Sequence, residues 1–298
     1  MTVNAISPRT ATFVGSVSIL LLSAVVGLIR GVSVSLGPIG GAAMIYTCSA
    51  LILLATFGSP KLSSIPRRYL WAGSVLFVAY EVCFSLSLGF AHNSKQTIEL
   101  GMINYLWPCF TLVLATIVDK PRRLFALIPG LGLSMAGIYL VQSGDGYSGL
   151  AEFLANLEQN PLSYTLSFSG AVIWAVYCVA TSKMAKGVNG ITLFVALTAL
   201  AMWCHYGLAG APSMRFNLQG VVLLGFASAA FAIGYATWNV GMLHGNVVML
   251  AAASYFIPIL SSAFAGWLLA AVLPVSFWQG AVLVCVGSMA CWVATKWP

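Results

Sequence analysis

The sequence predicts an all-α integral membrane protein with ten transmembrane helices, arranged as two inverted repeats of five helices. One observation behind this prediction is composition: 60% of the 298 residues are hydrophobic and 6% are charged, whereas about a quarter of the residues of a soluble domain are charged. The other is internal repetition. Tyr255 and Pro258 stand 150 residues after Tyr105 and Pro108, inside similar apolar runs. Both observations favour a membrane chain built from a duplicated unit.

Ten apolar runs of about 20 residues each are long enough to cross the roughly 30 Å of hydrocarbon in a bilayer. The predicted spans are residues 11–30, 38–58, 69–90, 97–118, 123–142, 161–183, 190–209, 217–241, 245–270 and 275–295. The first is expected to end near Arg30, followed by a turn rich in Gly and Ser. Gly130 and Gly137 of the fifth span recur as Gly280 and Gly287 in the tenth, which extends the repeat.

The longest connection between predicted spans divides the chain. Residues 1–142 form the first expected repeat, 143–160 an outer linker and 161–298 the second repeat. In the linker, apolar residues at i, i+3, i+4 and i+7 predict a short amphipathic helix on the outer membrane surface; they are Leu150, Phe153, Leu154 and Leu157. Because five spans precede the linker, the second half is expected to run inverted through the membrane, an arrangement typical of transporters.

The net charge of +7 is distributed unevenly. One side of the predicted topology carries Arg9, Lys61, Arg67, Arg68, Lys120, Arg122, Arg123, Lys183, Lys186 and Lys296. The other side carries Arg30, Lys95 and Arg215. The positive-inside rule therefore predicts that both termini are cytoplasmic. The membrane orientation thus accounts for the excess of basic residues. We therefore expect membrane lipid, and no nucleic acid, as a partner.

The fourth span contains a polar and aromatic stretch at the depth of the bilayer centre. Pro108 has no backbone N–H, so the carbonyl group of Asn104 loses its helical partner and must find protein, water or a ligand. The phenol of Tyr105 and the indole of Trp107 lie beside it in the sequence. Trp107 is about 15 Å into the helix at helical rise. A substrate-lining role is favoured, with packing of the aromatic rings as the alternative.

Other side chains at helical spacing extend this candidate binding site. Trp174 and Tyr177 are three residues apart, and Tyr235 lies three and four residues before Trp238 and Asn239, so each set shares a helix face. The candidate substrate-binding residues are Asn104, Tyr105, Trp107, Trp174, Tyr177, Tyr235, Trp238, Asn239, Ser254 and Tyr255. The candidate gating bends are Pro108 and Pro258. Static kinks are the alternative for the prolines.

Glu81 lies near the midpoint of the third predicted span. A charged group at the bilayer centre costs about 3 kcal/mol or more, so an acid there is a candidate functional group. No basic residue is predicted at its depth. Glu81 must therefore be protonated, hydrogen-bonded to Ser, Tyr or Asn, or matched by a cationic ligand. We expect a coupling role through proton exchange, with a structural hydrogen bond as the alternative.

Several other classes of protein are disfavoured. The sequence has no GxxxxGK[ST] motif for ATP, and His92, His205 and His244 fall at different predicted depths, so no metal and no cofactor are expected. An intramembrane enzyme would need a second acid, a Ser–His pair or a metal cluster beside Glu81. A channel would be lined by rings of polar groups, whereas this candidate site is aromatic. A secondary transporter that is not an enzyme is favoured.

With these features the chain resembles the drug/metabolite transporter superfamily, specifically its ten-helix EamA-type members. The stretch Asn104-Tyr105-Leu106-Trp107-Pro108 resembles that of the YddG-type aromatic amino-acid exporters. The resemblance implies export of aromatic and other large neutral amino acids across the bacterial inner membrane by alternating access; a different small metabolite or a toxic cation is the alternative cargo. A monomer is expected. Trp107 has Ile257 as its counterpart, so the binding site should be asymmetric.

Overall fold

The computed structural model describes residues 7–58, 62–119, 125, 127–143, 149–186, 188–245, 250 and 253–296. Helices make up nearly all of these ranges. The helices are α1 (Pro8–Ser23), α2 (Val25–Leu36), α3 (Pro38–Phe57), η1 (Leu62–Ser64), α4 (Arg67–Gly89), α5 (Ser94–Asn104), α6 (Trp107–Asp119), α7 (Ile128–Ser143), α8 (Gly149–Gln159), α9 (Pro161–Met184), α10 (Ile191–Leu208), α11 (Leu218–His244), α13 (Ile257–Leu268) and α14 (Val275–Lys296).

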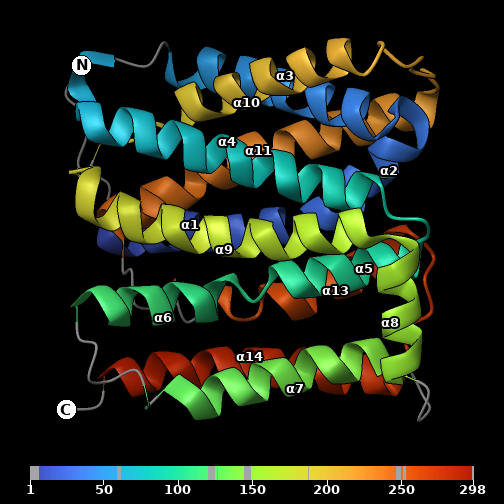
Figure 1. Ribbon diagram of the computed structural model, residues 1–298. Coiled ribbons are helices and arrows are strands. Elements are labelled where there is room, and N and C mark those ends of the chain that lie inside the picture. Colours follow the sequence, from blue (N-terminus) through green and yellow to red (C-terminus); the bar gives the residue numbers. More distant parts are fainter. Residues whose placement is uncertain are drawn as a thin grey trace.

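The long helices lie side by side, and α8 runs across them at one end (Figure 1). Within the described ranges, eight helical segments are long and apolar enough to cross a membrane. Two shorter apolar helices, Ile128–Val141 and Ile257–Leu268, fall within the predicted fifth and ninth spans. The predicted class, an all-α membrane protein, is confirmed. The count of ten spans stays a prediction.

The first span continues beyond Arg30, where the sequence suggested an end. Helix α2 reaches Leu36, and Gly37, with a φ of 76°, makes the turn into α3. The expected Gly- and Ser-rich turn is therefore almost entirely helical. The physical reason is that the Arg30 guanidinium is half-buried and donates a hydrogen bond of 3.0 Å to the carbonyl oxygen of Gly89 at the end of α4. The charge is satisfied within the helix bundle and does not mark a helix end.

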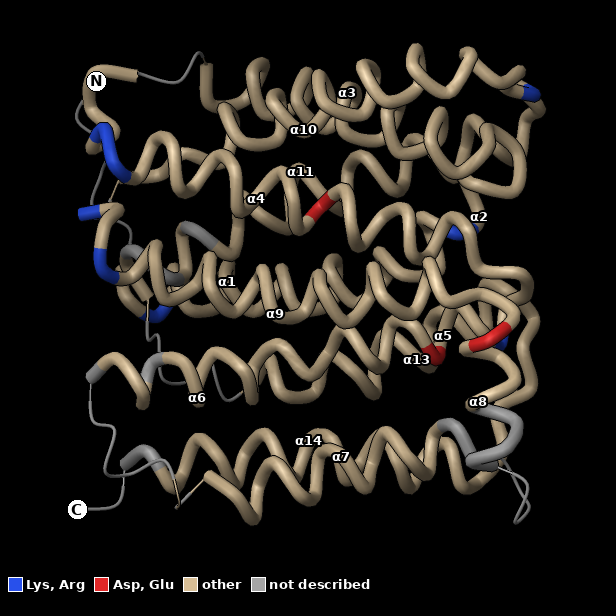
Figure 2. The backbone as a smooth tube through the Cα atoms, viewed as in Figure 1, with Lys and Arg blue, Asp and Glu red and all other residues tan. Residues whose placement is uncertain are grey.

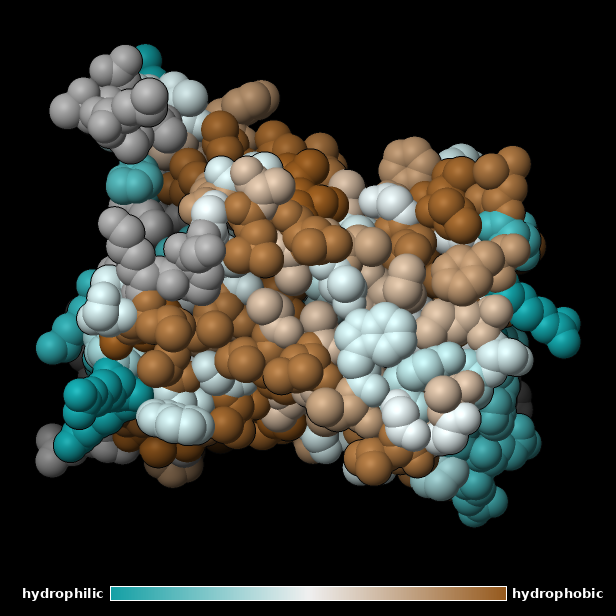
Figure 3. Space-filling view, turned by 90° about the horizontal axis from the view of Figure 1, so that it is seen from above, coloured by the Kyte–Doolittle hydropathy of each residue, from teal (hydrophilic) through white to brown (hydrophobic). Residues whose placement is uncertain are grey.

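Charged residues gather at the two ends of the helix bundle (Figure 2). Four of the basic residues stand where helices begin or end: Arg9 in the first turn of α1, Arg67 and Arg68 at the start of α4, and Lys183 in the last turn of α9. Lys95 stands in the first turn of α5, and Arg215 shortly precedes α11. The face seen in Figure 3 is largely hydrophobic between hydrophilic ends. This distribution fits a chain whose middle is in contact with lipid.

Helices of the first half of the chain pack against helices of the second half. Helix α1 packs on α11 and α4 on α9, while α3 packs on α10 and α7 on α14. The closest approach is between α7 and α14, where a Cβ atom built on Gly130 would lie 2.6 Å from the carbonyl oxygen of Gly287. A Cβ on Gly137 would lie 2.6 Å from the carbonyl oxygen of Gly280. Backbone therefore meets backbone at two points, and a larger residue would force the helices apart.

Candidate functional site

The predicted fourth span is two helices separated by a short break. Helix α5 ends at Asn104 and α6 begins at Trp107, with a turn at Tyr105 and Leu106 between them. The chain turns in the same way at residues 255–256, before α13. Breaks at equivalent places in both halves leave backbone polar groups available at membrane depth, as in transporters with discontinuous helices.

The helix breaks lie just before Pro108 and Pro258, and a gating role for these two prolines stays a prediction. Pro108 is the second residue of α6, and Pro258 is the second residue of α13. Proline is well tolerated in the first turn of a helix, because its missing N–H would have no partner there. Each proline therefore lies in the first turn of a half-helix, and the break is formed by the two residues before that helix, 105–106 and 255–256.

An aromatic cluster surrounds Trp174 on α9. Among the described residues, five aromatic rings have centroids within 6.3 Å of the Trp174 ring: Tyr80 at 4.4 Å, Tyr177 at 4.9 Å, Phe77 at 6.1 Å, and Trp107 and Tyr235 at 6.3 Å. These rings come from α4, α6, α9 and α11. Trp107, Trp174 and Tyr177 are only half-buried, so the cluster offers aromatic surface that a planar apolar group can contact.

A second aromatic layer supports this cluster on one side. The Phe77 ring is fully buried and contacts Phe194, at 5.8 Å between centroids. The hydroxyl of Tyr69 lies 3.4 Å from that of Tyr177 and 3.1 Å from that of Thr181. These contacts fix the orientation of the Tyr177 ring, which stacks on Trp174.

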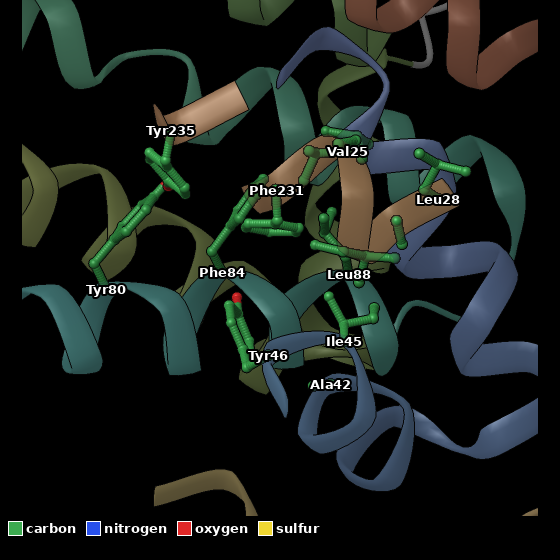
Figure 4. Close-up of a cluster of buried hydrophobic side chains, with 14 of the residues drawn as sticks. Val25, Leu28, Ala42, Ile45, Tyr46, Tyr80, Phe84, Leu88, Phe231 and Tyr235 are labelled. Atoms are coloured by element: carbon green, nitrogen blue, oxygen red, sulfur yellow. The ribbon is translucent and has the colours of Figure 1, made fainter. Parts of the chain in front are cut away.

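Glu81 is completely buried within a hydrogen-bonded group of side chains. The Tyr235 hydroxyl donates to Oε1 of Glu81 at 2.5 Å, and the Tyr46 hydroxyl donates to Oε2 at 2.7 Å. The Tyr46 hydroxyl also lies 2.6 Å from the hydroxyl of Ser85. Figure 4 shows Tyr46 beside the aromatic rings of α4 and α11. Each carboxyl oxygen of Glu81 thus accepts a phenol hydrogen bond.

Tyr235 joins this network to the aromatic cluster. Its hydroxyl contacts Glu81, while its ring lies 6.3 Å from Trp174 and 5.7 Å from Phe77. A change in the position of the Tyr235 ring would therefore change a hydrogen bond of the buried carboxyl group.

Asn104 links the aromatic cluster to a different element. The Tyr80 hydroxyl donates to its Oδ1 at 3.4 Å, and its Nδ2 donates to the carbonyl oxygen of Ser167 on α9 at 3.3 Å. The side chain of Asn104 is buried. Trp107, Trp174, Tyr177 and Tyr235 thus meet in one cluster, and Asn104 is one contact away.

Two further predicted binding residues lie in the helix breaks. Tyr105 and Tyr255 are both buried there, and the phenol of Tyr105 is close enough to that of Tyr80 for the two to interact electrostatically. The Tyr105 phenol lies against Ser261 of α13. Both tyrosines are buried, and their role in lining the substrate site stays a prediction.

Three further candidates give less information about the site. Trp238 is half-buried on α11, one turn beyond Tyr235. Ser254 is buried just before the second break. The side chain of Asn239 lies outside the described residues.

Tyr46 and Tyr80 are not among the site residues that the sequence predicts. A signal for Tyr80 was present, because Phe77, Tyr80, Glu81 and Phe84 are spaced at i, i+3, i+4 and i+7 and share one face of α4. Tyr46 carries no comparable local signal. Its contact with Glu81 joins residues 35 apart in the sequence.

Comparison with known proteins identifies relatives of this chain. No family model matches it. The chain is 51% identical to the aromatic amino acid exporter YddG of Salmonella typhimurium (strain 14028s / SGSC 2262), over 97% of this chain and 98% of that protein. It is 50% identical, over the same shares, to the aromatic amino acid exporter YddG of Escherichia coli (strain K12). A crystal structure that is 20% identical has the same fold, with a TM-score of 0.67 over 97% of this chain and 99% of the other. The chain therefore belongs to the YddG family of aromatic amino acid exporters, within the drug/metabolite transporters.

Proposed function

We propose that this protein exports aromatic and other large neutral amino acids across the bacterial inner membrane. The observation that carries the proposal is the half-buried ring of Trp174, which aromatic side chains from four elements surround at membrane depth. The two relatives that are about half identical to this chain are named aromatic amino acid exporters. Such a site selects cargo by stacking area.

The proposed binding pose uses both the cluster and the adjacent helix break. The side chain of the substrate stacks on Trp107 and Trp174, in contacts worth about 1 kcal/mol each beyond area burial. The substrate ammonium group lies near the backbone carbonyl of Asn104 and the tyrosine faces, which attract cations. The N-terminus of α6 carries a partial positive charge that favours the substrate carboxylate.

Transport follows an alternating-access cycle in which the two halves move relative to each other about the breaks at residues 105–106 and 255–256. The crosswise pairing of α1 with α11 and of α4 with α9 supports the division into repeats 1–142 and 161–298, joined by 143–160. In the proposed repeats, α9 is the counterpart of α1 and α11 is the counterpart of α4. Replacing α1 and α11 by their counterparts therefore gives the pair of α9 and α4. Both halves of one chain contribute rings to the cluster, so a single chain can form the proposed binding site.

Both termini are proposed to be cytoplasmic, and cysteine labelling tests this. In a cysteine-free background, Ser63→Cys and Ser182→Cys, both at exposed positions, should react with an impermeant thiol reagent only from the inside. Tyr147→Cys, which lies outside the described residues, should react only from the outside. Labelling of Tyr147→Cys from the cytoplasmic side alone would contradict both the orientation and the inverted repeat.

The export function is tested with purified protein in liposomes. We expect saturable counterflow of tryptophan and phenylalanine without ATP, and weaker counterflow of threonine because its side chain offers little stacking area. Tetraphenylphosphonium serves as the competing class of cargo. Transport of that cation without any transport of amino acids would overturn the proposed cargo, and non-saturating flux would indicate a channel.

A further inference from the structure

Helix α5 is enclosed by protein on all sides. Every side chain from Gln96 to Asn104 is buried, and α5 packs against α2, α4, α7, α9 and α13. In contrast, the side chains of residues 110–114 in α6 are partly exposed. The two halves of one predicted span therefore differ in packing. The enclosed half lies towards the end of the helix bundle that α8 crosses (Figure 1).

Hydrogen bonds join α5 to α9, and to the N-cap residue Asn160 of α9, at several successive positions. Asn160 Nδ2 donates to Gln96 Oε1 at 2.9 Å, and the Tyr164 hydroxyl donates to Glu99 Oε2 at 3.0 Å. The Ser167 hydroxyl donates to the carbonyl oxygen of Leu100 at 2.6 Å. The Asn104 bond to Ser167 continues this row towards the bilayer centre. The α5–α9 seam consists of Gln96, Glu99, Leu100 and Asn104 with Asn160, Tyr164 and Ser167.

These polar groups are buried, and the seam includes one acid. Glu99 is 1% exposed, and its Oε1 lies 3.9 Å from the ammonium of Lys95, which is about half exposed. A buried carboxylate is costly unless it is paired and hydrogen-bonded, as it is here. Because hydrogen bonds between protein groups exchange for hydrogen bonds to water at a small net cost, such a seam can open to water. An apolar seam would lose its whole burial energy.

Asn104 is the point where the seam meets the aromatic cluster. Its carboxamide accepts from Tyr80, whose ring is the nearest to Trp174, and donates to Ser167. A Cβ atom on Gly170 would lie 3.1 Å from Asn104 Nδ2, so the amide is held closely against α9. A ligand that moves the Tyr80 ring would weaken one of the two bonds that orient this amide.

We propose that the α5–α9 seam is the outer gate of the exporter, and that Asn104 couples the gate to the substrate bound at Trp174. This inference rests on the proposed function and on the orientation that places α8 outside. Substrate contact with Trp174 displaces Tyr80 and frees the Asn104 carboxamide from Ser167. The seam then opens from the bilayer centre outwards, and water replaces the hydrogen bonds between α5 and α9.

The test measures access to the seam in the full chain, purified and reconstituted without its native cysteines. A reporter thiol is introduced by Ser163→Cys, a buried position on α9, and its reaction with an impermeant thiol reagent is timed. Tryptophan should raise the reaction rate in the otherwise unaltered protein. Tyr164→Phe removes one hydrogen bond and should raise the rate about fivefold without substrate. Asn104→Leu should abolish the response to tryptophan.

Tyr206→Phe is the matched control. It removes a hydrogen bond of 2.7 Å to the carbonyl oxygen of Pro212, outside the seam, and should leave the rate unchanged. A second reporter, Thr97→Cys on α5, is used if Ser163→Cys does not fold. Thermal unfolding of each variant separates gate opening from general loss of structure.

The outcomes distinguish this inference from the proposed function. Equal rates in Tyr164→Phe, Tyr206→Phe and the otherwise unaltered protein would overturn the gate, even if amino acids are transported. A tryptophan response that persists in Asn104→Leu would overturn the coupling through Asn104. A faster reaction in Tyr164→Phe without any amino-acid transport would support the gate and overturn the proposed cargo.

Discussion

Replacing Trp174 with alanine is expected to lower the apparent affinity for tryptophan about 30-fold, which corresponds to about 2 kcal/mol. The Trp174 ring is the centre of the cluster, with five aromatic neighbours among the described residues, so its loss removes the largest stacking surface. Threonine transport should change less than about threefold. Counterflow in liposomes, measured over a range of substrate concentrations, gives both values. Trp107→Ala should act in the same direction with a smaller effect.

Trp71→Ala is the matched control for the loss of an indole ring. Trp71 lies on α4 and is 72% exposed, on a surface that faces lipid in the proposed membrane arrangement, and its replacement should leave both affinities unchanged. Trp174→Phe should recover part of the tryptophan affinity. If Trp174→Ala reduced tryptophan and threonine transport by the same factor, Trp174 would be a packing residue and the substrate would bind elsewhere.

Glu81→Gln is expected to keep counterflow exchange and to lose any acceleration of export by an imposed pH gradient. Glutamine has nearly the shape of glutamate and can still accept one of the two phenol hydrogen bonds from Tyr46 and Tyr235, but it cannot exchange a proton. Because Tyr235 also contacts Trp174, substrate binding and the protonation of Glu81 can influence each other. Transport by proteoliposomes with and without a pH gradient measures the effect.

Glu158→Gln is the control for this substitution, because Glu158 is exposed on α8 and should not affect transport. If export by the unaltered protein ignores the pH gradient, Glu81 is a structural hydrogen-bonding group. Loss of folding in Glu81→Gln would point to the same structural role.

Composition and spacing were enough to predict the membrane class and the place of the helix breaks, because both depend on local chemistry. A proline inside an apolar run predicts an interruption of the helix close by, so the regions around Pro108 and Pro258 could be identified from the sequence. Its exact effect could not, because proline is compatible with both a kink and the first turn of a new helix. The structure shows the latter.

The candidate site was harder to predict, because its contacts join helices distant in the sequence. The sequence offered no basic partner for Glu81, yet its two phenol partners come from α3 and α11, 35 and 154 residues away. Likewise Tyr105 has the right neighbours in sequence but packs towards Ser261. Spacing shows which side chains share a helix face; it does not show which other helix they contact.

The backbone contacts of Gly130 with Gly287 and of Gly137 with Gly280 have a practical consequence for measuring conformational change. Since neither helix can slide past the other without a clash of main chains, α7 and α14 form a fixed frame of reference. Spectroscopic probes on the lipid-facing side of this pair, at exposed positions such as Met135 and Val282, should keep a constant separation throughout the cycle. Any change in distance from that pair to a probe on another helix can then be assigned to that helix alone.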